Sequence, residues 1–306
     1  MRPAGKARGV SILGICERRA TPPGRMQRRP NANEPLRRDT SAAGSASTSR
    51  APRYTFWRRF RRLLIAAGLC AGVPLIGWTL LAIRPRAEAH AALISDAGVA
   101  VVHADTHVTF SSARSSSATG LLFVAGAVVD PVAYAPILRR VAEAGHTGIL
   151  MKLPRRGVFG GLDGPDVLMR GTSALAERTS VERWVVAGHS LGGGVAARLV
   201  GTFPEKFVAL VLIGSSGPRG FSLARTPLRV TQIYGTRDTV ETPERLERNL
   251  EHLPASTHRI RIDGGNHSQF AYYGLQPGDW PASITREQQQ RLMMSALLDV
   301  LARANR

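Results

Sequence analysis

The chain contains only two cysteines among its 306 residues, Cys16 and Cys70. No cysteine follows Cys70, so the C-terminal part of the chain can form neither a disulfide nor a metal–thiolate site, and it has no cysteine nucleophile. The sequence also shows no metal-binding or cofactor-binding pattern. We therefore expect a protein that uses no cofactor and whose chemistry, if it has any, rests on other residue types.

Acidic residues are scarce at the N-terminal end. Residues 1–62 contain 16 of the 41 lysines and arginines but only three acids, which gives this segment a net charge of +13 out of a total of +19. Large apolar residues are nearly absent before Tyr54, and a segment of this composition cannot bury enough surface to offset its conformational entropy. We therefore expect residues 1–62 to form a disordered, arginine-rich tail.

Charged residues are absent from residues 63–83. As a helix this segment spans about 30 Å, which is the thickness of the hydrocarbon core of a bilayer. The excess of arginine before it predicts that the N-terminus stays in the cytoplasm and that the C-terminal part is translocated. We therefore predict a single-pass membrane anchor. The alternative is a cleaved signal peptide, with Ala87-Glu88-Ala89 as its cleavage site.

Residues 92–306 are enough for one domain with its own core. Short apolar runs that are typical of buried strands alternate there with segments that are typical of helices. We expect strands at 99–102, 107–110, 121–124, 149–151, 184–187, 208–213, 229–234 and 258–262, and helices at 130–144, 165–178, 193–202, 243–252 and 285–304. This alternation predicts an α/β fold whose mainly parallel sheet is covered by helices on both faces.

A serine stands where one of these strands must turn into a helix. Ser190 is the centre of Gly188-His189-Ser190-Leu191-Gly192, directly after the apolar run 184–187. In such a G-x-S-x-G pattern the serine occupies a strained turn with its hydroxyl exposed, and the flanking glycines let the strand and the helix pass close to each other. Ser190 is therefore the predicted nucleophile. The alternative is a glycine-rich turn without chemistry.

A serine hydroxyl needs a base to take up its proton, and the base needs an acid to orient it. In α/β folds the functional groups collect at the carboxyl ends of the strands. Asp238 follows the strand at 229–234 and His267 follows the strand at 258–262. The chain order Ser190, Asp238, His267 is that of an α/β-hydrolase triad.

Other ionisable residues offer weaker alternatives for these roles. Glu241 is a second candidate for the acid, and Asp238 would then be a turn residue or a helix cap. Asp263 is expected to form a turn. His267 could be a solvated loop histidine, but His189 immediately precedes the nucleophile and cannot fold back as its base.

Acyl transfer also needs hydrogen-bond donors for the oxyanion of the tetrahedral intermediate. The residue after the nucleophile, here Leu191, supplies one through its backbone N–H. The second is expected from the loop after the strand at 121–124, and we assign it to the N–H of Ala127.

The connection between Ser215 and Leu228 is too short for the helical cap that many lipases insert at this point. We therefore expect a fold without a large cap domain and with an open, shallow site. Four aromatic residues could line that site or could belong to the core: Phe159, Phe270, Tyr272 and Tyr273.

Four segments carry a resemblance to a known family: GLLFVAGAVVDPVAYAPILRRVAEAGHTGILMKLP, ERWVVAGHSLGGGVAAR, QIYGTRDTVETPE and GGNHSQFAYYGLQPGD. In these segments the chain resembles bacterial membrane-anchored α/β-hydrolases related to the dienelactone hydrolases. The resemblance implies an α/β-hydrolase fold, a serine triad at Ser190, Asp238 and His267, and one N-terminal membrane helix. The arginine-rich tail departs from the family in its length, and Val124-Ala125-Gly126 departs in lacking a proline before the glycine. Dienelactone hydrolases use a cysteine nucleophile, so their substrate is not implied.

These observations predict a serine hydrolase of carboxylic esters or thioesters that is anchored to the membrane by residues 63–83. Its substrate is expected to be a small-molecule ester or thioester. No nucleic-acid partner is expected, because the basic tail lacks interleaved aromatic residues before Tyr54. Two other hypotheses remain. One is a non-catalytic α/β-hydrolase-fold binding module of the cell envelope, and the other is a tail that binds nucleic acid or anionic lipid.

Overall fold

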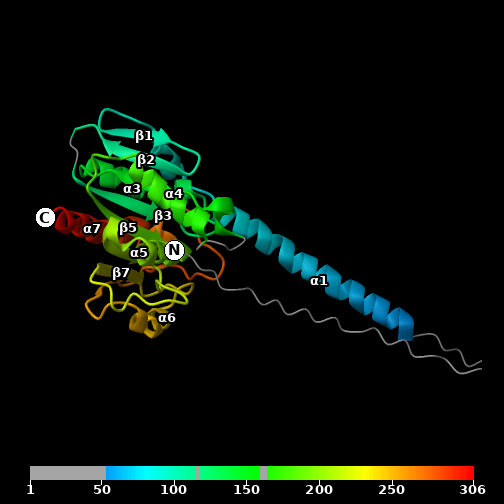
Figure 1. Cartoon of the computed structure of the whole chain (residues 1–306). Helices are drawn as coiled ribbons and strands as arrows, with labels where there is room; N and C mark the ends of the chain where they lie inside the picture. The colour runs from blue at the N-terminus through cyan, green and yellow to red at the C-terminus, as the bar shows by residue number, and fades with distance from the viewer. Residues whose placement is uncertain (1–52, 115–116, 159–163) are drawn as a thin grey trace, which may run out of the picture. The chain divides into compact units, whose positions relative to one another are not determined.

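The computed structural model describes residues 53–114, 117–158 and 164–306 (Figure 1). Most of the predicted tail, residues 1–52, lies outside these described residues. The longest helix, α1 (Arg53–Ala82), contains nearly all of the uncharged run and also the arginines that precede it. It is the one helix in the described part of the chain that is long and apolar enough to cross a membrane. Its apolar side chains, such as Leu69 and Ile76, are exposed.

After a short helix, α2 (Ala87–Ala91), the chain enters an eight-stranded sheet with the order β1-β2-β4-β3-β5-β6-β7-β8. The bounds of the strands are β1 (Val99–His103), β2 (His107–Ser112), β3 (Thr119–Val124), β4 (Gly148–Met151), β5 (Arg183–His189), β6 (Phe207–Ile213), β7 (Arg229–Gly235) and β8 (His258–Ile262). The strand β2 is antiparallel to both β1 and β4, and all the other neighbours are parallel. The predicted mainly parallel sheet is therefore confirmed.

Helices cover both faces of this sheet, as predicted. One face carries α3 (Ala135–Glu143) and α7 (Arg286–Ala304), and the other carries α4 (Pro165–Ala176) and α5 (Leu191–Thr202). Successive side chains of a strand point to opposite faces, so each central strand contributes to both cores. Their apolar burial supplies the main stabilisation of the domain.

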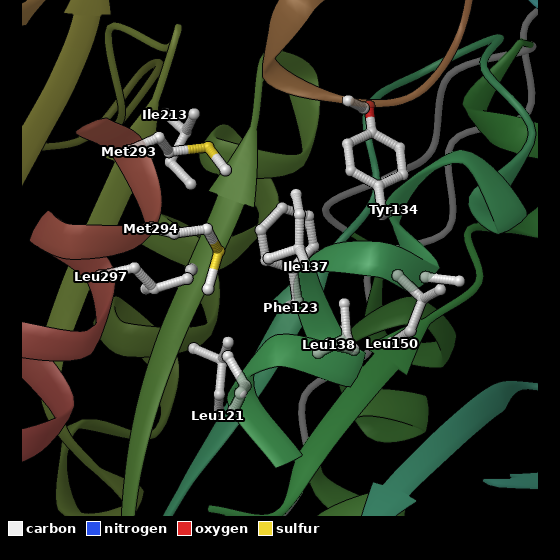
Figure 2. Close-up of a cluster of buried hydrophobic side chains, with 14 of the residues drawn as sticks. Leu121, Phe123, Tyr134, Ile137, Leu138, Leu150, Ile213, Met293, Met294 and Leu297 are labelled. Carbon is white, nitrogen blue, oxygen red and sulfur yellow. The ribbon is translucent and has the colours of Figure 1, made fainter. Parts of the chain in front are cut away.

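The strand β3 shows how the two cores are separated. Leu121 and Phe123 belong to the cluster under α3 and α7, whereas Leu122 and Val124 belong to the cluster under α4 and α5. Figure 2 shows the first cluster, in which Met293, Met294 and Leu297 of α7 point toward β3 and β5. A strand that is buried on both faces favours apolar residues on both, and this is why residues 121–124 of β3 are a continuous apolar run.

Two predicted helices differ in detail from the structure. The helix expected at 130–144 begins with the 3-10 helix η1 (Pro131–Tyr134), which the Asp130 carboxylate caps by accepting the Val132 N–H at 3.0 Å. The helix expected at 243–252 is divided into α6 (Pro243–Arg248) and the 3-10 turn η4 (Leu250–His252). The break lies at Asn249. Its side-chain amide donates to the carbonyl groups of Ser216 and Pro218, which holds this residue against the connection that follows β6.

The remaining short elements are 3-10 turns: η2 (Pro154–Gly157), η3 (Pro204–Lys206) and η5 (Ser268–Phe270). The connection between β6 and β7, residues 214–228, is described throughout and contains neither a helix nor a strand. The predicted fold without a large cap at this point is therefore confirmed.

Candidate active site

The turn after β5 holds Ser190 in a strained backbone conformation. Its φ of 54° and ψ of −125° lie in a region that L-residues rarely adopt, and such strain persists only where the surroundings fix it. The Ser190 N–H donates to the Ile213 carbonyl at 2.9 Å, and the Ser190 carbonyl accepts the Gly193 N–H at 3.0 Å. The side chain of Ser190 is partly exposed at the carboxyl edge of the sheet.

Glycines make this turn possible because the backbones touch. A Cβ on Gly188 would lie 2.2 Å from the Gly192 carbonyl oxygen, and a Cβ on Gly192 would lie 2.4 Å from the carbonyl oxygens of Val124 and Ala125. Any side chain at either position would therefore push β5, α5 and the loop after β3 apart. The two glycines predicted to permit close passage of strand and helix do so in the structure.

Asp238 and His267 are brought together from the loops after β7 and β8. The Nδ1–H of His267 donates to Asp238 Oδ2 at 2.7 Å, and both side chains are buried. Asp238 Oδ1 accepts the backbone N–H groups of Val240 and Glu241 at 3.0 and 2.7 Å. Burial raises the pKa of Asp238, while the bond from His267 and the backbone N–H of Glu241 oppose that rise.

A glycine at the end of β6 leaves room for this pair. Gly214 has a φ of 48°, and a Cβ there would lie 3.2 Å from His267 Nδ1 and 3.3 Å from Asp238 Oδ2. Both features require glycine at this position.

Buried polar side chains fix the loop that carries His267. The Asp279 carboxylate accepts the His267 N–H at 3.3 Å, the Ser268 N–H at 2.8 Å and the Ser268 hydroxyl at 2.6 Å. From α7, Gln289 both accepts the Asn266 N–H at 3.0 Å and donates to the Asn266 carbonyl at 2.7 Å. These contacts hold the backbone on both sides of the histidine.

Arg286 completes this clamp at the other end of the same loop. Its guanidinium donates to the carbonyl groups of Ser268, Ala271 and Tyr273. Burial lowers its pKa to about 10, and the charge of Arg86 contributes to the shift. Neither Arg286 nor Asp279 was predicted from the sequence to hold this loop, although Asp279 lies in the segment GGNHSQFAYYGLQPGD on which the family resemblance rested.

The loop after β3 is held by the phenol of Tyr134, whereas the His267 loop is held by carboxylate, amide and guanidinium groups. The hydroxyl of Tyr134 accepts the Gly126 N–H at 3.1 Å and lies 2.8 Å from Nδ1 of His189. Because the phenol can donate to Nδ1 of His189, this contact is satisfied by the neutral ring that carries its proton on Nε2. Burial and then the neighbouring charge of His267 lower the pKa of His189 well below its usual value.

This arrangement leaves the Ala127 backbone amide of the loop without a protein acceptor among the described residues. The Gly126 N–H is taken by Tyr134 and the Val128 N–H by the Arg156 carbonyl at 2.7 Å, while the Ala127 N–H between them has no such partner. Leu191 is the first residue of α5, where backbone N–H groups have no acceptor within the helix. The N–H groups of Leu191 and Ala127, the two predicted oxyanion donors, therefore have no acceptor among the described residues of α5 or of the loop after β3.

The structure does not bring all three triad candidates into hydrogen-bond contact. The rings of His267 and His189 lie 4.4 Å apart, centroid to centroid, so His267 stands beside the residue that precedes Ser190. The Ser190 hydroxyl makes no hydrogen bond with any described residue. Asp238 and His267 thus share a direct hydrogen bond, and Ser190 lies near them in the turn after β5.

Comparison with known proteins adds the family. The chain matches the alpha/beta hydrolase family over residues 120–291, more than half of its length. It belongs to that family. A protein of Mycobacterium phage D29 that is named as a non-heme haloperoxidase is 32% identical over 99 residues, which are 31% of this chain and 36% of that protein. The hydrolase therefore spans only about a third of the length of this relative.

The solved structures to which the chain is similar are more distant in sequence. An alpha/beta hydrolase enzyme from the metagenome of lagoon sediments at Mar Chica, Morocco, has a TM-score of 0.48 and 17% identity, and covers 66% of this chain and 99% of its own. A CIB-like hydrolase from Thermoplasma acidophilum has a TM-score of 0.49 and 12% identity, over 66% of this chain and 100% of its own. A structure reported for two metagenome-derived lipolytic enzymes, LipS and LipT, has a TM-score of 0.48 and 12% identity, over 69% and 99%.

Glu241, the alternative candidate for the acid, contacts other residues than His267. Its carboxylate accepts the Ser216 N–H at 2.9 Å and pairs with Arg245 at 3.2 Å. It makes no contact with His267 among the described residues, so Asp238 is the acid that the fold joins to the histidine. Asp263 is exposed and pairs with Arg261, as a residue of a surface turn would.

The aromatic residues considered as lining of the site are mostly core. Phe270 and Tyr273 are fully buried in the cluster under α3 and α7, and Tyr272 is nearly so. Their burial follows from the Arg286 and Asp279 clamp, which folds the His267 loop back onto the domain. Phe159 lies outside the described residues.

A cavity of about 470 Å³ lies far from these groups, at the opposite end of the sheet. It is lined by the starts of β5 and β7, at Arg183 and Arg229, and by the end of α7. Sites in parallel α/β sheets lie at the carboxyl ends of the strands, so we assign no catalytic role to this cavity.

Proposed function

We propose that the protein is a serine hydrolase that cleaves carboxylic esters or thioesters through an acyl-enzyme. The observation that carries the proposal is the buried hydrogen bond between His267 and Asp238, built beside a serine in a strained strand-to-helix turn. Catalytic hydrogen bonds are often long before substrate binds, so the absence of a bond between Ser190 and His267 does not oppose these roles.

The proposed reaction begins at the Ser190 hydroxyl. Its oxygen attacks the carbonyl carbon of the ester, and His267 takes up the proton at Nε2, because Nδ1–H is held by Asp238. The tetrahedral intermediate collapses, and His267 gives the proton to the departing alcohol or thiol. Water then attacks the acyl-serine with His267 again as the base, which releases the carboxylic acid and restores the hydroxyl of Ser190.

Backbone amides stabilise the negative oxygen in this scheme. The N–H groups of Leu191 and Ala127 are proposed to donate to it, because neither backbone amide has a competing acceptor among the residues that the structure describes. Such donors act where charge develops in the transition state and need no rearrangement. The Tyr134 hydroxyl supports the second donor by holding the adjacent Gly126 N–H.

The proposal places this hydrolase in the group of membrane-anchored members related to the dienelactone hydrolases. Residues 63–83 span the membrane, residues 1–62 stay in the cytoplasm as a basic tail, and residues 92–306 form the extracytoplasmic hydrolase domain. A retained anchor is favoured over a cleaved signal peptide. Cleavage after Ala89 would remove Arg86, whose N–H donates to the Tyr272 carbonyl at 2.9 Å.

A second candidate activity comes from the similarity to the protein named as a haloperoxidase. Hydrogen peroxide could replace water as the acceptor of the acyl group, giving a peroxyacid that oxidises a halide. Adding hydrogen peroxide and bromide to the ester assay, with bromination of an indicator dye as the readout, separates this activity from plain hydrolysis.

The full-length protein in detergent micelles, assayed with p-nitrophenyl esters and acyl thioesters of increasing chain length, tests the main proposal. We expect turnover by the wild type and by Ser173→Ala, which makes the same change at an exposed position of α4. Ser190→Ala should lose activity by a factor of about 10⁴ or more. A folded wild type without turnover on any ester or thioester would instead favour a binding module of the cell envelope.

A further inference from the structure

The end of α1 is bound to the loop that carries His267. The Ala82 carbonyl accepts the Gly274 N–H at 2.7 Å, and the Arg86 N–H donates to the Tyr272 carbonyl at 2.9 Å. The contact is close, because a Cβ on Gly274 would lie 3.0 Å from the Ala82 oxygen. The last turn of the apolar helix is therefore part of the folded domain rather than the start of a linker.

The same segment also connects to the side of the oxyanion loop. The Tyr272 N–H donates to the Ala133 carbonyl at 2.9 Å, next to Tyr134. Beyond α2, Arg139 of α3 donates to the Ile94 carbonyl at 2.7 Å. The junction between α1 and the domain thus rests on the His267 loop, which in turn contacts η1, the element that follows the oxyanion loop.

Chain length limits the distance between this junction and the active site. Gly274 is seven residues after His267, and seven residues span at most about 25 Å when fully extended. The 3-10 turn η5 lies within this segment and shortens it further. The uncharged run of α1 ends at Ile83, beside Ala82. If α1 crosses a bilayer, one surface of that bilayer therefore lies within this distance of His267.

Exposed apolar side chains lie at the carboxyl edge of the sheet, where the candidate catalytic groups also lie. Outside α1, the large apolar side chains that the described residues expose are Ile94, Val102, Val128, Val158, Met169, Trp280 and Leu292. Three of these follow the carboxyl ends of strands: Val128 after β3, Val158 after β4 and Trp280 after β8. We call these three residues the apolar rim.

The backbone that presents the rim is strained. Val128 has a φ of 61°, which is unfavourable for a β-branched residue, and Arg155 and Arg156 have φ values of 47° and 52°. The Val128 N–H donates to the Arg156 carbonyl at 2.7 Å, which ties the loops after β3 and β4 together. Strain of this kind is typical of functional surfaces, and here it leaves two valines exposed.

Arginines accompany the rim on both sides. Arg155 and Arg156 precede Val158, with Arg156 paired to the Asp130 carboxylate at 2.6 Å. Arg237 donates to the Pro281 carbonyl beside Trp280 at 2.9 Å. Apolar side chains flanked by arginine are the composition with which proteins lie on anionic lipid surfaces.

We propose that the carboxyl edge of the sheet faces the bilayer that holds α1, and that the substrate is the acyl ester of a lipid carried in that bilayer. The ester reaches Ser190 across the apolar rim without entering bulk water. This inference rests on the proposed hydrolase activity and on the proposed membrane anchor.

Reconstituted full-length protein tests the inference. It is placed in vesicles of phosphatidylcholine and phosphatidylglycerol that contain a fluorogenic long-chain acyl ester, and its rate is divided by the rate on a water-soluble short-chain ester. We expect the double variant Val158→Ser with Trp280→Ser to lower this ratio about tenfold, because two apolar contacts with the lipid are lost. The control, Val102→Ser with Met169→Ser, removes exposed apolar side chains elsewhere and should keep the ratio within about twofold of the wild type.

The two rates separate the possible failures. Equal ratios for the rim variant and the control, or a wild type that cleaves the soluble ester but not the vesicle ester, would overturn the inference and leave the hydrolase activity standing. Loss of both rates in the wild type would overturn the proposed function itself. The soluble rate also reports whether each variant is folded.

Discussion

The two loops that flank Ser190 are built differently. The His267 loop is clamped by polar side chains from three directions, the buried Asp279 and Gln289 and the partly buried Arg286. The loop after β3 is held by one phenol, Tyr134, and by a strained contact and an ion pair that Val128 and Asp130 make with Arg156. A base must keep one ring orientation, which justifies many contacts. A backbone donor needs only its amide direction fixed, and one hydrogen bond is enough for that.

The largest effect should come from the acid that orients the base. Asp238→Asn replaces an acceptor with a group that can donate to His267, which favours the wrong tautomer, and we expect kcat to fall by about 10⁴. Steady-state kinetics on a soluble ester measure this. Asp263→Asn makes the same change on an exposed acid and should have no effect, so similar losses in both variants would contradict the assigned role.

The second largest effect on kcat is expected from Asp279, one of the three residues that clamp the His267 loop. Asp279→Asn weakens three hydrogen bonds, one from the His267 N–H and two from Ser268, and misplacement of the ring by a fraction of an ångström should lower kcat about 100-fold with a small change in KM. The free energy of unfolding should fall by about 2 kcal/mol. A loss of stability without a loss of kcat in the folded fraction would show that the clamp is merely structural.

The space around the Asp238–His267 pair can be tested by substituting two glycines that both have a positive φ. Gly214→Ala adds a Cβ against His267 and Asp238, and we expect kcat to fall about thirtyfold. Gly220→Ala has the same kind of backbone strain, with a φ of 73°, but nothing within 4 Å of the new Cβ. Kinetics that respond to both substitutions alike would attribute the effect to backbone strain alone.

On the other loop, Tyr134→Phe removes the only side chain that holds the Gly126 amide. We expect kcat to fall about tenfold because the adjacent Ala127 donor is less well placed, with KM nearly unchanged. Tyr234→Phe is a control outside the site, since its ring lies under Arg259. An unchanged kcat for Tyr134→Phe would mean that the loop after β3 is fixed by other contacts.

The smallest effect concerns pH and stability. Because burial keeps the folded-state pKa of His189 well below its usual value, only the unfolded chain gains a proton there as the pH falls below about 6.5. Stability from this group is thus present above that pH and is lost as the pH decreases. His189→Asn should flatten the decline in thermal midpoint between pH 7 and pH 5, and an identical decline in both proteins would contradict this.

Much of the fold could be predicted because central strands such as β3 and β6 contain continuous apolar runs, and the order of the predicted strands and helices was correct throughout the described residues. Ser190, Asp238 and His267 could be proposed because a strand end precedes each of them. The clamp could not be predicted, since Asp279, Gln289 and Arg286 act on backbone groups that are distant in sequence and have no local pattern. For the same reason, nothing in the sequence showed that Tyr134 would reach Gly126.

Identification of the phosphonylated residue tests the central claim most directly. The full-length protein is treated with a fluorophosphonate, whose phosphorus is attacked by an activated serine with loss of fluoride, and the modified peptide is found by mass spectrometry. The account predicts one phosphonyl group, on Ser190, and none in Ser190→Ala or Asp238→Asn over the same time. Modification of another serine at the same rate, or an unmodified Ser190 in folded wild-type protein, would contradict it.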